Sequence, residues 1–264
     1  MPRRATRRRS GARRMLNKVP EVTLVFWIIK ILGTTVGETA ADYMSETLKL
    51  GLTKTTLVTG AVLAGMLVVQ FRARRYVPWI YWTVVVLISI AGTLITDLLT
   101  DQIGVRLEVT TSVFAVALAA TFLVWYRTEH TLSIHSIDTA RREAFYWLAI
   151  LVTFALGTAA GDLLSERVNI GYWEAALLFG ALIAVVAVAY YRFGLPEVVA
   201  FWTAYILTRP FGASMADFLT QPDRRHGLGL SSNQVSLVCL GLIVVAVGFL
   251  TLRQRRADAA IAAP

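Results

Sequence analysis

Eight apolar stretches, each about 20 residues long, follow one another along the chain and constrain its fold more than any other feature. A helix needs about 20 residues to cross the hydrocarbon core of a bilayer, where every backbone polar group must be paired within the segment. The stretches run over 22–42, 52–71, 77–99, 107–126, 144–164, 172–192, 197–217 and 231–252. The sequence therefore predicts an all-α, polytopic integral membrane protein with eight transmembrane helices.

The composition agrees with this fold class and argues against others. Hydrophobic residues make up 56% of the chain and charged residues only 16%, which is unusual for a soluble domain. The net charge of +9 lies mainly in the tails and in short gaps, so no partnership with nucleic acid is expected. One cysteine, Cys239, cannot form an intramolecular disulfide. A signal peptide ending near residues 39–41 is disfavoured, because the same pattern recurs three times downstream.

The positions of lysine and arginine predict the orientation. With eight spans both termini share a side, and that side carries 18 of the basic residues against 6 on the other. Basic residues are retained in the cytoplasm, so both termini are expected there. We therefore expect residues 1–19 to be a basic cytoplasmic tail, 20–252 a single membrane domain in contact with lipid, and 253–264 a second cytoplasmic tail.

The odd-numbered stretches share a pattern that the even-numbered stretches lack. Each odd stretch begins with an aromatic pair ending in tryptophan, continues into small or hydroxylated residues and ends in acid, whereas the interiors of the even stretches carry no charge. The four tryptophans are Trp27, Trp82, Trp147 and Trp202. The pattern predicts four parallel two-helix repeats over 20–72, 77–127, 142–192 and 196–252, with the even helices as scaffold.

One alignment of the repeats takes Gly33, Gly92, Gly157 and Thr208 as equivalent. It divides the repeats into two subtypes, because the spacing from the tryptophan is six residues in copies one and four and ten residues in the others. It also divides the acids into two columns four residues apart, which places both on one helix face. The first column holds Glu38, Asp97 and Asp162, and the second holds Asp42, Asp101, Glu166 and Asp217.

These acids are the main candidate site. At about 1.5 Å per residue, Glu38 lies roughly 24 Å from the start of its stretch, in the outer third of the membrane. Carboxylates near a helix C-terminus face a negative dipole end, which favours a cation or proton nearby. We expect the first column to supply metal ligands or proton carriers. For the second column, solvated helix ends are an equally good interpretation. Nearby hydroxyl oxygens come from Thr34, Thr93 and Thr158.

Two basic residues, Lys30 and Arg209, lie inside predicted spans. Neither reaches water easily, so each is expected to pair with a carboxylate or to line a wet cavity. The alternatives are that Lys30 extends to the membrane interface, and that Arg209 forms a structural salt bridge with Asp162 or Glu38. Pro210 removes a backbone donor and predicts a kink or break in the seventh helix.

Several segments together resemble a known family. They are Pro20-Glu21-Val22-Thr23-Leu24 with Phe26-Trp27, the run 33–39, Gly157-Thr158-Ala159-Ala160-Gly161-Asp162 and Thr208-Arg209-Pro210-Phe211-Gly212-Ala213. The chain resembles uncharacterised bacterial membrane-anchored proteins built from four tandem copies of a two-helix repeat of unknown function. The resemblance covers about 19–252 and implies the same architecture in a bacterial inner membrane. It implies no activity.

The charges lead to a functional hypothesis: a membrane transporter or exporter of cations, with proton coupling as an option. Oxygen donors without cysteine or histidine motifs favour a hard divalent metal such as manganese or magnesium. Two alternatives stay open, namely a transporter of a zwitterionic organic solute and a non-transporting scaffold or stress-response protein. We do not expect an enzyme or a resident cofactor, because no nucleophile–base set or phosphate-binding loop is present.

Overall fold

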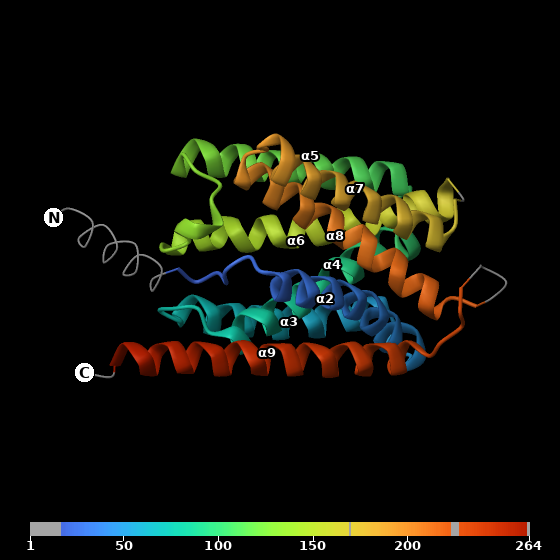
Figure 1. Cartoon of the computed structure of the whole chain (residues 1–264). Helices are drawn as coiled ribbons and strands as arrows, with labels where there is room; N and C mark the ends of the chain where they lie inside the picture. Colours follow the sequence, from blue (N-terminus) through green and yellow to red (C-terminus); the bar gives the residue numbers. More distant parts are fainter. Residues whose placement is uncertain (1–16, 169, 223–226, 263–264) are drawn as a thin grey trace.

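The computed structural model describes residues 17–168, 170–222 and 227–262 (Figure 1). Residues 1–16 of the basic tail and the side chain of Glu166 lie outside this part. All regular structure in the described part is helical, as predicted. The described part holds eight long helices: α2 (Leu24–Asp42), α3 (Leu52–Arg72), α4 (Pro78–Asp97), α5 (Leu107–Glu129), α6 (Ala140–Asp162), α7 (Tyr172–Phe193), α8 (Glu197–Thr220) and α9 (Ser232–Ala262).

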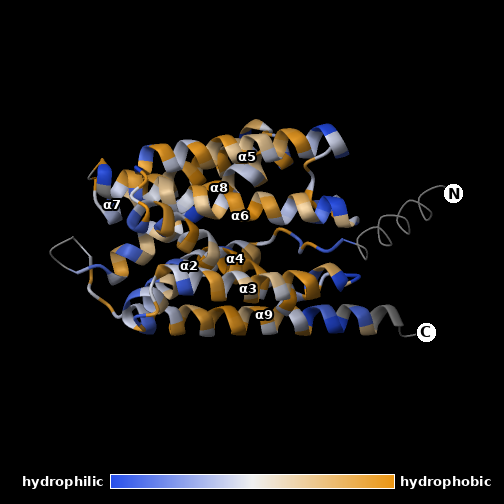
Figure 2. Ribbon diagram, turned by 180° about the vertical axis from the view of Figure 1, so that it is seen from behind, coloured by the Kyte–Doolittle hydropathy of each residue, from blue (hydrophilic) through white to orange (hydrophobic). Residues whose placement is uncertain are grey.

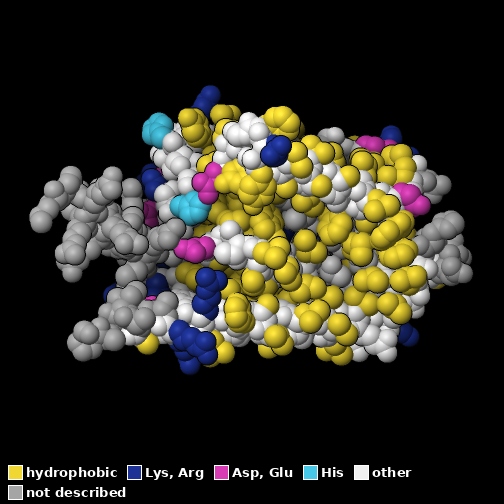
Figure 3. Space-filling model, viewed as in Figure 1, with side chains coloured by type: hydrophobic (Ala, Val, Ile, Leu, Met, Phe, Trp, Pro, Cys, Tyr) yellow, Lys and Arg dark blue, Asp and Glu magenta, His cyan; other side chains and the backbone are white. Residues whose placement is uncertain are grey.

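The chain is a polytopic membrane protein with seven candidate spans. Among the described helices, all the long ones except α8 are long and apolar enough to cross a membrane. Helix α8 has 24 residues and packs in the same bundle, but it carries a buried arginine at its centre. Hydrophobic residues predominate along the middle of the helices and hydrophilic ones toward their ends (Figure 2), and hydrophobic side chains cover much of the face seen in Figure 3. This distribution fits a lipid-embedded bundle.

The helices form two layers. Helices α2, α4, α6 and α8, which we call the inner ring, pack each against the next, and α8 closes the ring against α2. Outside them, α3 packs on α4, α5 on α6, α7 on α8 and α9 on α2. Of the most apolar 18-residue segment of α2, 61% is buried inside the bundle, whereas of the corresponding segment of α5 only 11% is buried. The prediction that the odd helices form the interior and the even helices the scaffold is therefore confirmed.

Four glycines allow the inner helices to approach closely. Each faces one residue of the next helix in the ring, and an added Cβ would collide with it; on Gly92 it would lie 2.7 Å from the Cβ of Phe154. The four contacts are Gly37 with Ser89, Gly92 with Phe154, Gly157 with Arg209 and Gly212 with Thr34. In each contact, the glycine stands ten residues after the tryptophan of its own repeat. Its partner stands seven residues after the tryptophan of the next helix in the ring. The inner helices therefore run parallel, in one register.

This register corrects the alignment made from sequence. Equivalent glycines are those ten residues after each tryptophan, so the two subtypes of repeat do not exist. Fifteen residues after each tryptophan stands an aspartate: Asp42, Asp97, Asp162 and Asp217. Eighteen residues after it stands a hydroxyl that donates to the carbonyl four residues earlier, at 2.8–3.1 Å in all four copies. The earlier alignment was wrong by one turn in two copies, because a shift of four residues preserves the helix face.

Three of the inner helices end in the same way. Immediately after Asp42, Asp97 and Asp162, the chain makes a π-helical segment of five residues. The segments are η1 (Tyr43–Thr47), η2 (Leu98–Gln102) and η4 (Leu163–Arg167). Such segments are frequent at functional sites. Helix α8 has none and runs without interruption through Pro210, where a break was an expected option.

Both ends of the described chain lie at the same end of the bundle. The Lys18 Nζ donates to the carbonyl of Phe71 at 3.1 Å, and Gln254 Nε2 donates to that of Tyr76 at 3.1 Å. Lys18 also forms an ion pair of 2.6 Å with the buried Glu143. These contacts fasten the segment before α2 and the end of α9 to the connection between α3 and α4. Helix α9 continues to 262, through most of the predicted tail at 253–264.

The close approach at Gly92 makes a testable prediction. We expect Gly92→Ala to lower the free energy of unfolding by about 1–3 kcal/mol, because the added methyl group overpacks the contact with α6. Gly65→Ala in α3 is the matched control, since nothing lies within 4 Å of its added Cβ. That change should be neutral or stabilising by up to about 1 kcal/mol. Unfolding in mixed micelles measures both, and equal effects would contradict the close-packing interpretation.

Candidate functional site

The side chain of Arg209 lies at the centre of the inner ring and contacts the other three helices of the ring. It is fully buried. Its Nη2 donates to Glu38 Oε2 of α2 at 2.8 Å, to Thr158 Oγ1 of α6 at 2.6 Å and, in a shorter contact, to Thr93 Oγ1 of α4. Its Nη1 donates to the Thr34 carbonyl at 3.2 Å. One guanidinium thus joins all four inner helices.

Local structure prepares this position. Gly157 makes room for the Arg209 side chain, since a Cβ there would overlap its Cβ and Cγ. The hydroxyl of Thr158 donates to the carbonyl of Phe154 at 3.3 Å, and the hydroxyl of Thr93 donates to Glu38 Oε2 at 3.2 Å. Their lone pairs are therefore free to accept from the guanidinium. Of the two salt-bridge partners expected for Arg209, the structure gives Glu38.

Lys30 lies in the same buried region without a hydrogen-bonding partner for its amine in the described part of the chain. Its Nζ lies 4.0 Å from the ring centroid of Phe154 and 4.2 Å from that of Tyr205. The side chain is fully buried, so it does not extend to the interface, and within the described residues its amine has no hydrogen bond to a carboxylate. Cation–π contacts contribute about 2 kcal/mol when desolvated. The buried centre therefore holds two basic side chains and one carboxylate, that of Glu38.

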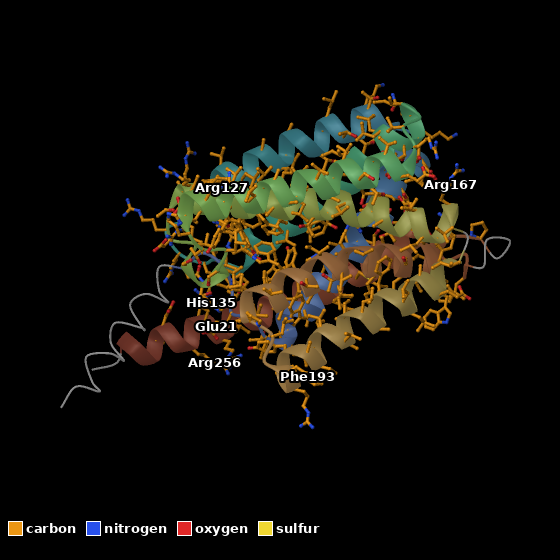
Figure 4. The ribbon with its side chains drawn as sticks, turned by 90° about the horizontal axis from the view of Figure 1, so that it is seen from above. Glu21, Arg127, His135, Arg167, Phe193 and Arg256 are labelled. Carbon is orange, nitrogen blue, oxygen red and sulfur yellow. The ribbon has the colours of Figure 1, made fainter. Side chains whose placement is uncertain are left out.

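The structure brings the other acids together at the end of the inner ring opposite the chain termini. Asp97 lies within electrostatic range of the carboxylates of Glu38, Asp42, Asp101 and Asp162. Of these, Glu38 is buried, Asp42, Asp97 and Asp162 are half-buried, and Asp101 is exposed. Arg167 is the last residue of η4, close in sequence to Asp162. Figure 4 shows it at the opposite end of the molecule from His135 and Arg256.

Two further predicted site residues, Thr34 and Asp217, are buried. The Thr34 hydroxyl donates to the Ile31 carbonyl at 2.6 Å, and the backbone oxygen of Thr34 accepts from Arg209 Nη1. Asp217 is buried with 8% exposure. Within the described residues, no three His, Cys, Asp or Glu side chains form a group that could hold a metal ion. The assignment of Glu38, Asp97 and Asp162 as metal ligands therefore stays a prediction.

Sequence reasoning missed an aromatic layer near the terminal end of the inner ring. Its members stand one residue before each tryptophan, and all are buried. The hydroxyls of Tyr81 and Tyr146 lie 2.5 Å apart, and the rings of Phe26 and Phe201 have centroids 6.0 Å apart. We call these four residues the aromatic layer. The signal was visible, because an aromatic residue occupies this position in every copy, but only packing shows that they face one another.

Comparison with known proteins supports the repeat register. The family model described as Repeat of Unknown Function (DUF347) matches four times, over 25–76, 80–131, 145–195 and 200–256. Each match begins two residues before the tryptophan of its copy, in agreement with the structural register. The resemblance inferred from sequence is confirmed. No curated protein and no solved structure matches the chain.

The buried ion pair predicts a non-additive mutant cycle. We expect Glu38→Gln or Arg209→Gln alone to cost about 3–5 kcal/mol of stability, because each leaves an uncompensated buried charge. The double variant should cost clearly less than the sum, since neither charge remains. Unfolding in mixed micelles measures the cycle. Additive losses would show that the two charges do not depend on each other.

Proposed function

The chain belongs to a family defined by a repeat of unknown function, and from its geometry we propose that it transports cations through the inner ring. The observation that carries the proposal is the buried pair of Arg209 and Glu38, at which all four inner helices meet. Charged side chains inside a membrane are costly and usually mark a pathway for ions, protons or substrates.

Five layers of side chains along the ring axis support a pathway. Positions 15, 11, 7 and 3 residues after the tryptophan of each repeat, and one before it, follow one another at intervals of four residues, so each lies about one helical turn from the next and faces nearly the same way as it does. The first layer is the four equivalent aspartates, which attract cations by their negative potential. The next two contain Glu38 with its threonines and then Arg209, the fourth contains Lys30, and the aromatic layer closes the path.

The ion pair is a suitable gate. Arginine keeps its charge in proteins, so Arg209 always requires an acceptor. A cation or a proton that reaches Glu38 competes with the guanidinium for the carboxylate. When Glu38 changes partner, Arg209 retains the hydroxyls of Thr93 and Thr158 and the carbonyl of Thr34. Exchange of partners therefore couples occupancy of the acidic end to the packing of all four helices.

The donors on this path favour a hard cation. Carboxylate and hydroxyl oxygens suit magnesium and manganese, whereas softer metals favour sulfur or imidazole ligands. The proposal places the protein in a bacterial inner membrane with eight crossings, α8 included. Because loops rich in lysine and arginine stay in the cytoplasm, this proposal has both termini and the aromatic layer facing the cytoplasm and the aspartates facing the outside.

Flux measurements in liposomes test this function. We expect the purified protein to carry Mg²⁺ or Mn²⁺, and Asp97→Asn or Asp162→Asn to lower the rate by about tenfold or more, equivalent to about 1.4 kcal/mol. Asp101→Asn is the matched control. It removes the same charge from an exposed carboxylate, where water and salt screen its effect, so flux should change little.

Three results would count against the proposal. Absence of flux for metals, protons and amino acids would favour the scaffold alternative. Flux of amino acids without metal would favour a zwitterionic solute. Reduced abundance of Asp97→Asn and Asp162→Asn, with unchanged flux per molecule, would make these acids structural. Protein in the liposomes is therefore quantified for every variant.

A further inference from the structure

A cavity of about 540 Å³ lies outside the proposed pathway, between α2, α7, α8 and the connection before α6. Helices α2 and α8 are neighbours in the inner ring, and α7 packs on the outside of α8. The cavity lies where these three helices meet. Its walls are largely apolar and include Trp27, Ile31, Ile183, Val186 and Ala204. An apolar hollow on a membrane-embedded surface is a site for a hydrocarbon chain.

The cavity has the depth of one leaflet. Its lining on α8 extends from Glu197 at the start of the helix to Thr208. Eleven residues of helix span roughly 17 Å at about 1.5 Å per residue, and half of a hydrocarbon core is about 15 Å. A chain entering at Glu197 would therefore end near the bilayer midplane. There it would lie beside Thr208 and Ile31, the residues next to Arg209 and Lys30.

The mouth of the cavity carries a carboxylate and an imidazole. Glu197 Oε1 lies 3.7 Å from His135 Nδ1, and their side chains are 63% and 50% exposed. Tyr190 and Tyr191 of α7 also line the cavity. A carboxylate beside aromatic rings attracts an ammonium group, and a protonated imidazole attracts a phosphate. The connection at the mouth is held in place, because Trp202 Nε1 donates to the Leu132 carbonyl at 3.0 Å.

We propose that this cavity binds a phospholipid with a primary ammonium headgroup, of the ethanolamine type. The lipid comes from the leaflet on the side of the chain termini. Its ammonium group lies at Glu197, its phosphate faces His135, and one acyl chain occupies the apolar hollow. Bound there, it packs directly against α2 and α8, the two helices that carry the buried bases.

Lipid retention tests the site independently of transport. The protein is purified in mild detergent, and its bound lipids are measured by native mass spectrometry after exchange into phosphatidylethanolamine, phosphatidylcholine or phosphatidylglycerol. We expect wild type to retain phosphatidylethanolamine preferentially. Ala187→Trp, which fills the cavity, should lower retention by about tenfold, equivalent to about 1.4 kcal/mol. Val188→Trp is the control, because Val188 is 52% exposed and is not part of the lining.

A second variant tests the headgroup. Glu197→Gln should abolish the preference for phosphatidylethanolamine while leaving total lipid retention in place. Ala204→Leu is a milder filling variant if Ala187→Trp does not accumulate, and it too should lower retention. Equal retention by the filled variants and by Val188→Trp would overturn the site. A preference of wild type for phosphatidylglycerol, or no headgroup preference, would overturn the assigned lipid.

Discussion

The buried guanidinium of Arg209 is the group on which the inner ring depends. A permanently charged side chain among apolar helices needs several oxygen acceptors, since its desolvation is costly. Here the acceptors come from α2, α4 and α6, while the base itself comes from α8. Because hydrogen bonds hold only over short distances, this one group fixes the levels of four helices relative to one another.

The four repeats supply a symmetric frame, and their differences supply the chemistry. Glycine, aspartate and a hydroxyl recur 10, 15 and 18 residues after the first-helix tryptophan of each repeat (Trp27, Trp82, Trp147 and Trp202), where they set helix approach and helix ends. At the positions seven and eleven residues after it, the copies diverge. One copy provides Arg209, one provides Glu38, and two provide the threonines between them. A fourfold frame thus surrounds a centre with no fourfold symmetry, as a buried ion pair between single side chains requires.

The outer helices determine which surfaces of the inner ring are covered and which are left open on the side that faces lipid. Each packs on the inner helix of the following repeat, so the copies are interlocked around the ring rather than stacked as separate hairpins. This arrangement covers the inner helices unevenly. Between α7 and α2 it leaves the cavity that ends beside Thr208. The lining of the cavity and the buried charges are therefore only one residue apart along α8.

The sequence by itself determined the helices, their division into inner and outer, the repeats and the gathering of acids at one end. These follow from local properties, namely the length of apolar stretches and the charges within them. Only the tertiary structure decided the register of the repeats, because a shift of one turn leaves the helix face unchanged. It also decided that Arg209 pairs with Glu38 and that Lys30 lies between Phe154 and Tyr205. Those partners depend on distances between helices, which no spacing along a single helix specifies.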